Sequence, residues 1–144
     1  MARIKISFSE DFIYQCEIPV LIGHINYGNH LSNDAFLRLA HEARLRFLKE
    51  IGASEIDIGG SGLIMSSASI MFKSQVFYPE TLLFKIAIEN MSEIGFNILY
   101  KVTKLSSKKE AARIKTEMIC FDYNLNKITT MPDSFNDKLN NLGS

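Results

Sequence analysis

The feature that most constrains the fold is a polar loop that leads directly into a long, largely apolar helix. The loop, residues 23–34, holds two histidines, three asparagines, one aspartate and two glycines. Ser32 or Asn33 is a suitable N-cap, and Gly52 a suitable stop after a helix that runs to about Ile51. Its apolar residues recur every three or four positions and cover most of the circumference: Phe36, Leu37, Leu39, Ala40, Ala43, Leu45, Phe47 and Leu48. Such a helix is predicted to be enclosed by other structure.

Strand-like segments occupy most of the remaining chain. Alternation predicts half-buried strands over 3–8 and 11–22, the second with Phe12, Tyr14, Cys16 and Ile18 on one face. After the connector 53–61, turn signals separate four further strands, over 62–77, 81–91, 95–105 and 110–123. A short run over 127–132 extends the last of these strands.

The order of these elements favours one architecture. Short connections predict antiparallel pairing between neighbouring strands. One helix cannot cover both faces of such a sheet, so a strongly curved sheet should wrap around it. The sheet edges that remain would then pair with a second copy of the chain.

Length and charge indicate a single-domain protein and argue against several kinds of partner. The 144 residues make one domain, predicted as 1–132 with a polar C-terminal tail over 133–144 that forms a short helix or a frayed end. Sixteen basic and sixteen acidic residues cancel, which argues against a nucleic-acid or anionic-membrane partner. No apolar run approaches the ~20 residues of a membrane span, and no signal segment is visible, so we expect a cytoplasmic protein. Cys16 and Cys120 are expected to be buried free thiols.

Residues 22–52 resemble the signature of the 4-hydroxybenzoyl-CoA and acyl-CoA thioesterase families. The usual pattern there is Asp-x-Asp-x-x-Gly-His-Val-Asn-Asn, followed by an aromatic-rich helix that ends near Glu-Ala-Arg. In this chain, residues 24–33 are His-Ile-Asn-Tyr-Gly-Asn-His-Leu-Ser-Asn, and Glu42-Ala43-Arg44 closes the motif. Later segments are similar to the family as well: 69–82, 94–98 and 112–116.

The resemblance implies an α+β hotdog fold, a curved antiparallel sheet around one long central helix. It also implies an acyl-CoA or acyl-carrier thioesterase, active as a homodimer or homotetramer with sites at subunit interfaces. Coenzyme A, or the carrier protein, would belong to the substrate, and no cofactor or metal is expected. No His-x-x-x-His pair lies on the helix, which agrees with the absence of a predicted metal site.

The departures from the family pattern decide the candidate catalytic residues. Asn26 stands where many members have a catalytic aspartate. A neutral amide cannot act as base or nucleophile, but it can orient a water or donate to the thioester oxygen. The candidate bases are Asp34, which could equally stabilise the helix dipole, and His30, which could equally hold the loop. Free amides at the helix start would stabilise an oxyanion. His24 and His41 are predicted to be structural, and Glu42 to pair with Arg44 or a partner arginine.

The substrate-binding candidates are mostly aromatic or basic: Tyr27, Asn33, Phe36, Phe72, Phe96 and Arg113. The phenylalanines either line a pocket or fill the core. Arg113, together with Lys101, Lys104 and Lys115, either meets CoA phosphates or solvates the sheet.

Two other functions remain open on the sequence alone. A non-catalytic acyl-CoA-binding protein is supported by Asn26 in the aspartate position. A hotdog hydratase or dehydratase could use His30 with Asp34, but the proline-rich motif associated with that branch is absent.

Overall fold

The structure, a computed structural model, describes residues 4–8 and 11–142. In this part of the chain the elements, in order, are β1 (Tyr14–Pro19), the single 3-10 turn η1 (Ile22–His24), α1 (Asn33–Glu50), β2 (Gly62–Phe72), β3 (Thr81–Glu89), β4 (Gly95–Lys104), β5 (Glu110–Asp122), β6 (Lys127–Ile128) and α2 (Asp133–Asn141).

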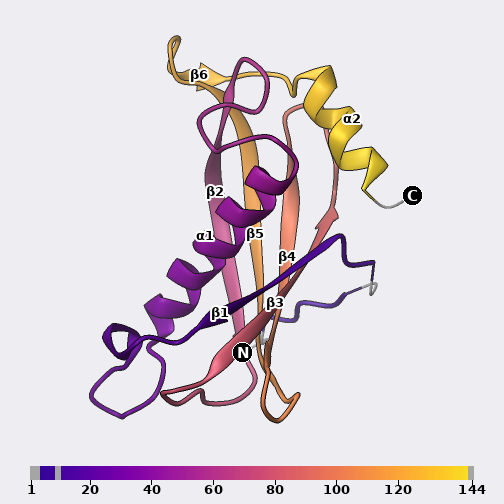
Figure 1. The fold of residues 1–144 in the computed structure, drawn as a ribbon. Helices are drawn as coiled ribbons and strands as arrows, with labels where there is room; N and C mark the ends of the chain where they lie inside the picture. Colours follow the sequence, from indigo (N-terminus) through magenta and orange to yellow (C-terminus); the bar gives the residue numbers. More distant parts are fainter. Residues whose placement is uncertain (1–3, 9–10, 143–144) are drawn as a thin grey trace.

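The strands form a single antiparallel sheet in the order β1-β3-β4-β5-β2, and β6 pairs with β5 beside this path. The sheet curves, and α1 lies along its concave face (Figure 1). The predicted α+β hotdog architecture is therefore confirmed. β1 and β2 stand at the two ends of the strand order. Pro19 is the last residue of edge strand β1, a position where its missing N–H interrupts no ladder.

Helix α1 has the predicted limits and a buried face opposite an open one. Ser32 is the N-cap with an extended backbone, and Gly52 follows the helix at a φ of +76°, which only glycine adopts at little cost. The buried residues are Ala35, Phe36, Leu39, Ala40, Ala43, Arg44, Phe47 and Leu48. Leu45, which was predicted to be enclosed, is 43% exposed. One chain therefore covers α1 on one side only.

Residues 4–8 and 11–12 lie over the convex face of the sheet. Residues 4–8, predicted as a strand, form no strand. Ile6 instead packs with Ala87 and Leu99. Phe12 joins this cluster through its contact with Phe8, so it does not share a face with Tyr14, whose ring packs on Phe47 of α1 at 5.7 Å between centroids. The N-terminal residues differ from the prediction because the outer face of the sheet is apolar and is shielded from water by their side chains. Alternation of polar and apolar residues does not reveal this role. Residue 3 lies outside the described residues.

The C-terminal segment 133–142 is part of the core. Phe135 and Leu139 of α2 are buried, and the ring of Phe135 lies 5.8 Å from that of Phe96 on β4. The preceding run, predicted as a strand to residue 132, is a strand only over β6.

Both cysteines are free, with Cys120 buried and Cys16 half-buried. Burial raises the pKa of the Cys120 thiol to about 11, so this group is not an activated nucleophile. Across residues 4–8 and 11–142, no helix combines the length and apolarity needed to cross a membrane.

Candidate functional site

The loop before α1 is closed on itself and fastened to the β2–β3 connection. Ile25 and Leu31 form an isolated antiparallel bridge, and the N–H of Asn26 donates to the carbonyl of His30 at 3.0 Å. The N–H of Leu31 donates to the carbonyl of Val76 at 2.7 Å. These bonds hold the motif residues against a segment more than forty positions away in the sequence.

Asn26 and His30 meet at Gly28. The Asn26 Oδ1 accepts a hydrogen bond from the Gly28 N–H at 2.9 Å. A Cβ on Gly28 would lie 3.2 Å from the His30 Nε2 and 3.3 Å from the Asn26 Oδ1. Glycine is needed here for this close approach rather than for its backbone angle, since the left-handed residue of the loop is Asn29 at φ +65°.

The hydrogen bond of His30 defines its tautomer. Nδ1 lies 3.1 Å from the carbonyl oxygen of Leu31. A carbonyl can only accept, so Nδ1 carries the proton and the Nε2 of the neutral ring has a free lone pair. His30 therefore presents a proton acceptor on the side of Gly28 and Asn26.

Asp34 lies at the start of α1 but is engaged by its own helix. The pKa of its carboxyl is lowered first by a hydrogen bond from Ser32, with further contributions from the backbone of Asp34 and Ala35 and from Arg38. The Arg38 guanidinium lies 3.7 Å away, and the Asp34 side chain is 78% exposed. The carboxylate thus accepts from backbone amides at the helix N-terminus, the same amides that the sequence analysis predicted would stabilise an oxyanion.

A pocket of about 230 Å³ opens between the loop, the start of α1 and the end of β2. We call it the loop pocket. It brings together His30, Asn33, Phe36 and Phe72 from the predicted set, and the rings of Phe36 and Phe72 meet edge-on at 5.4 Å. The sequence did not indicate that the β2–β3 connection forms its other wall: Lys73, Ser74, Gln75 and Val76.

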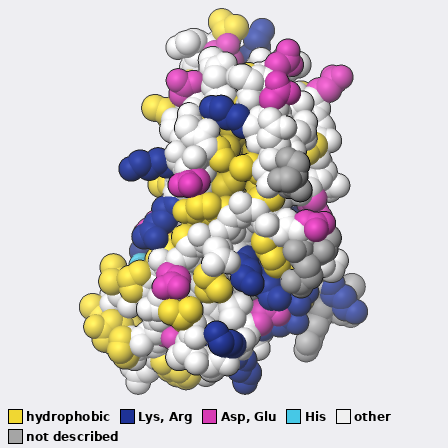
Figure 2. All heavy atoms as spheres, turned by 45° about the vertical axis from the view of Figure 1, so that its right-hand side comes forward, with side chains coloured by type: hydrophobic (Ala, Val, Ile, Leu, Met, Phe, Trp, Pro, Cys, Tyr) yellow, Lys and Arg dark blue, Asp and Glu magenta, His cyan; other side chains and the backbone are white. Residues whose placement is uncertain are grey.

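Exposed apolar side chains are frequent in the segments around the loop pocket, and Figure 2 shows hydrophobic groups gathered at one end of the molecule. Tyr27 is fully exposed rather than folded into the pocket. The neighbouring exposed side chains are Leu21, Ile22, Phe72, Phe77 and Tyr78. An apolar concentration of this kind is typical of a binding or subunit interface.

Two predicted substrate-binding residues lie elsewhere. Phe96 is buried against α2. Arg113 lies on the convex face, where it binds both oxygens of Glu110, at 2.7 and 3.1 Å, and the carbonyl of Ile6 at 2.9 Å. Neither residue lines the loop pocket of its own chain.

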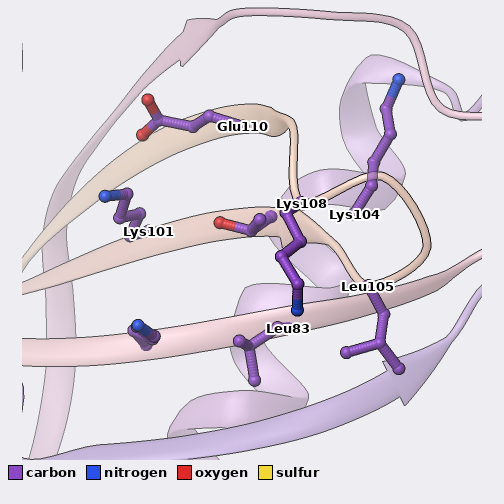
Figure 3. A pocket seen from close by; sticks show the side chains of 8 residues that line it. Leu83, Lys101, Lys104, Leu105, Lys108 and Glu110 are labelled. Carbon is purple, nitrogen blue, oxygen red and sulfur yellow. The ribbon is translucent and has the colours of Figure 1, made fainter.

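A second pocket, of about 330 Å³, lies over β3, β4 and the β4–β5 turn. Figure 3 shows lysine side chains from these separate segments around it. We call it the lysine pocket, and its lysines are Lys85, Lys101, Lys104 and Lys108. Glu110 also lines it, but that carboxylate is bound to Arg113. The pocket therefore has an excess of positive charge.

A buried polar chain runs from α1 into the sheet. Glu55 accepts from His41 at 2.5 Å and from the Arg44 Nε at 3.3 Å. The Arg44 Nη1 donates to the Tyr100 hydroxyl at 3.0 Å, and that hydroxyl is hydrogen-bonded to Thr116 at 2.9 Å. The sequence had suggested Glu42 as the partner of Arg44, but Glu42 pairs with Arg46. Glu55, in an irregular connector, gave no sequence signal.

Within the described ranges, no three His, Cys, Asp or Glu side chains lie close enough together to hold a metal ion.

The fold and the loop pocket define a hotdog protein with a cleft beside its central helix. The family described as the thioesterase-like superfamily matches residues 20–139. The chain belongs to this superfamily, and the expectation of a thioester hydrolase is confirmed at the level of the family. A comparison with curated proteins found no match.

Solved structures support the same fold at low sequence identity. A 1,4-dihydroxy-2-naphthoyl-CoA thioesterase from Synechocystis is 22% identical, with a TM-score of 0.82 over 91% of this chain and 98% of that one. A DHNA-CoA thioesterase from Staphylococcus aureus is 21% identical, with a TM-score of 0.77 over 90% and 94%. Another Staphylococcus aureus protein, solved in complex with CoA, is 14% identical, with a TM-score of 0.81 over 90% and 82%.

Proposed function

We propose that this protein hydrolyses an acyl-CoA or acyl-carrier thioester in the loop pocket, with His30 as the general base. The observation that carries the proposal is the hydrogen bond from the His30 Nδ1 to the Leu31 carbonyl, which leaves Nε2 as a proton acceptor beside Asn26. Asp34 is the weaker candidate base, because its carboxylate is already bound by Ser32, Arg38 and the helix start.

The proposed reaction needs only groups of this chain and water. The His30 Nε2 takes a proton from a water as the water oxygen attacks the thioester carbonyl carbon. The Oδ1 of Asn26 is bound by Gly28, so its Nδ2 group is available to donate to the developing oxyanion. The tetrahedral intermediate then expels the thiolate, which takes the proton back from His30, and the products are a free acid and a thiol.

The lysine pocket lies on the convex face of the sheet, where Lys85 and Lys101 lie over the Phe12 ring. We therefore propose that it receives the phosphates of CoA, or of a phosphopantetheine arm, whose thioester lies in the loop pocket of a neighbouring subunit. Ammonium groups act as point charges and attract a polyanion without needing a fixed geometry. Replacing Lys104 and Lys108 by Gln should raise KM for acyl-CoA and leave kcat unchanged, whereas Lys127→Gln on β6 should change neither. The same double variant should hydrolyse an acyl-N-acetylcysteamine thioester, which lacks phosphates, as well as wild type does. An unchanged KM for acyl-CoA would remove the lysine pocket from the proposal.

The active form is proposed to be an oligomer in which the free edge of β2 pairs with a second copy. Strand β2 is eleven residues long, ends the strand order, and exposes Ser66, Ser67 and Ala68 at its centre. A long unpaired edge of this kind is a template for strand pairing. The pairing would also cover part of the open side of α1.

The experiment that tests the function is thiol release from short, medium, long and aromatic acyl-CoAs. Asn26→Ala should lower kcat by roughly 10²-fold if the amide donates to the oxyanion. The competing function, non-catalytic acyl-CoA binding, is favoured by Asn26 in the usual aspartate position. Saturable binding without turnover of any acyl-CoA, combined with turnover gained in Asn26→Asp, would establish that alternative instead.

A further inference from the structure

A third pocket, of about 330 Å³, lies between α1 and the adjacent strands β2 and β5. We call it the Arg44 pocket. Leu37, Arg38, His41 and Arg44 of α1 line it on one side, and Met65 and Thr116 of the sheet on the other. The loop pocket also lies between α1 and β2, through Phe36 and Phe72. The two pockets therefore lie along the same helix and strand.

Arg44 is the residue of this pocket that indicates a ligand-binding role. Its side chain is only 7% exposed, and a buried guanidinium needs acceptors for its five N–H groups. Glu55 takes Nε and Tyr100 takes one Nη1 hydrogen. In the part of the chain that the structure describes, no acceptor binds Nη2. The Nη2 donors of Arg44 are therefore accessible from the cavity that this residue lines, where water or a ligand can accept from them.

The free hydrogen-bond donors around Arg44 favour an anionic acceptor, although Glu55 balances the charge of Arg44 itself. Both carboxylate oxygens of Glu55 are engaged, one by His41 and the other by Arg44. Arg38 adds a second guanidinium to the lining, and its partner Asp34 is on the exposed surface at 3.7 Å. Burial lowers the pKa of Arg44, but Tyr100 and Glu55 outweigh burial and the net shift is upward, so the guanidinium stays charged.

The remaining walls are apolar. Leu37 and Met65 contribute aliphatic side chains beside the guanidinium. A planar carboxylate matches the fork of an arginine, and an apolar chain matches the leucine and methionine. From Phe36 in the loop pocket to Arg44 is eight helical residues, or roughly 12 Å, which is the reach of a medium-length chain.

We propose that the Arg44 pocket binds a carboxylate at the far end of the acyl group, so that the preferred substrates are medium-length ω-carboxyacyl thioesters. The inference rests on the proposed thioesterase function for the position of the reacting end. The carboxylate would take the free Nη2 donors, and the thioester would lie in the loop pocket near His30.

The first test is the ratio of kcat/KM for octanedioyl-CoA to that for octanoyl-CoA. Wild type should favour the carboxylated substrate by about tenfold or more, the usual effect of a charged hydrogen bond. Met65→Trp fills the pocket from edge strand β2 and is compared after sedimentation shows that it keeps the wild-type oligomer, and Arg44→Lys keeps the charge without the fork; each should abolish most of this preference. Arg46→Lys, two residues further along α1 and on its exposed face, should retain it. A wild-type ratio near one, or a ratio that Met65→Trp leaves unchanged, overturns the proposal.

The second test does not depend on turnover. Titration of the protein with octanedioate, followed by NMR, should shift resonances of residues 37–44 and 65 saturably, and Met65→Trp should remove these shifts. If the protein binds octanedioate in this way but hydrolyses no acyl-CoA, the thioesterase proposal is wrong and the carboxylate site in the Arg44 pocket stands. If the protein hydrolyses acyl-CoAs but octanedioate shifts no resonance, the carboxylate site in the Arg44 pocket is wrong and the thioesterase proposal stands.

Discussion

Asp34 shows how one residue can serve the fold rather than the reaction. Its folded-state pKa lies below the ordinary value of 3.8, first because of Ser32 and then because of the helix start and Arg38. A lowered carboxyl pKa stabilises the folded state above the unfolded pKa, and this stabilisation is lost as the pH falls through the folded pKa.

Asp34→Asn should therefore lower Tm at pH 7 and leave kcat for thiol release nearly unchanged. The difference in Tm should shrink below about pH 4 and vanish at the lowest pH values. Thermal melts of both proteins between pH 7 and pH 2 measure this. A large loss of kcat with an unchanged Tm would make Asp34 the base and contradict the structural role.

Glu55 is expected to matter far more for stability than its place in a connector suggests. It neutralises the buried Arg44, whereas Glu42 pairs with Arg46 where both side chains are more than 40% exposed. Removing one partner of a buried pair costs about 3 kcal/mol, and removing one partner of an exposed pair costs less than about 1 kcal/mol. Urea denaturation of Glu55→Gln and Glu42→Gln should show this contrast. Equal stabilities would mean that Arg44 is not held by Glu55.

At the scale of elements, α2 contributes to the core through two residues four positions apart. Phe135 is fully buried against Phe96, and Leu139 is nearly so. Phe135→Ala should lower the free energy of unfolding by about 3 kcal/mol, while Asn140→Ala, on the exposed side, should change it by less than about 0.5 kcal/mol. Denaturant unfolding measures both. A small effect of Phe135→Ala would mean that α2 is not docked in solution.

The elements could be predicted from the sequence wherever hydrophobic periodicity is strong. The central helix, its cap and the four long strands have the expected places, because their side chains alternate between a core and an open face. Residues 4–8 and 11–12 could not be placed this way, since Ile6, Phe8 and Phe12 cover the convex face of a sheet formed by later segments. The polar composition of 133–144 likewise concealed the spacing of Phe135 and Leu139.

The candidate site could be predicted only where it is local in sequence. His30, Asn33 and Phe36 come from one motif, and the structure gathers them with Phe72 in the loop pocket. The wall over 73–76 could not be found, because the two segments meet only in the fold, through contacts such as the hydrogen bond between Leu31 and Val76, and no sequence pattern joins them. Arg113 belongs to the opposite face for a related reason: neighbouring Ala112 and Ile114 of β5 point into the core.

At the scale of the whole molecule, the open side of α1 and the free edge of β2 both favour a second copy. Ser67→Lys would bring like charges together if two β2 edges pair, which opposes association. Wild type should sediment as a dimer or tetramer, and the variant should dissociate at micromolar concentration. Thr130→Lys, an exposed position outside β2, is the matched control. A monomeric wild type with full activity would contradict the proposed interface.

The most direct test of the central claim is the rate of thiol release by His30→Asn, with His24→Asn as the control in the same loop. The amide of asparagine takes the place of the His30 Nδ1 and can still donate to the Leu31 carbonyl, so the loop should keep its shape and its Tm. The account predicts that kcat falls by roughly 10²- to 10⁴-fold in His30→Asn, while His24→Asn stays within a few-fold of wild type. A His30→Asn protein with wild-type kcat would show that the base lies elsewhere and would contradict the proposed mechanism.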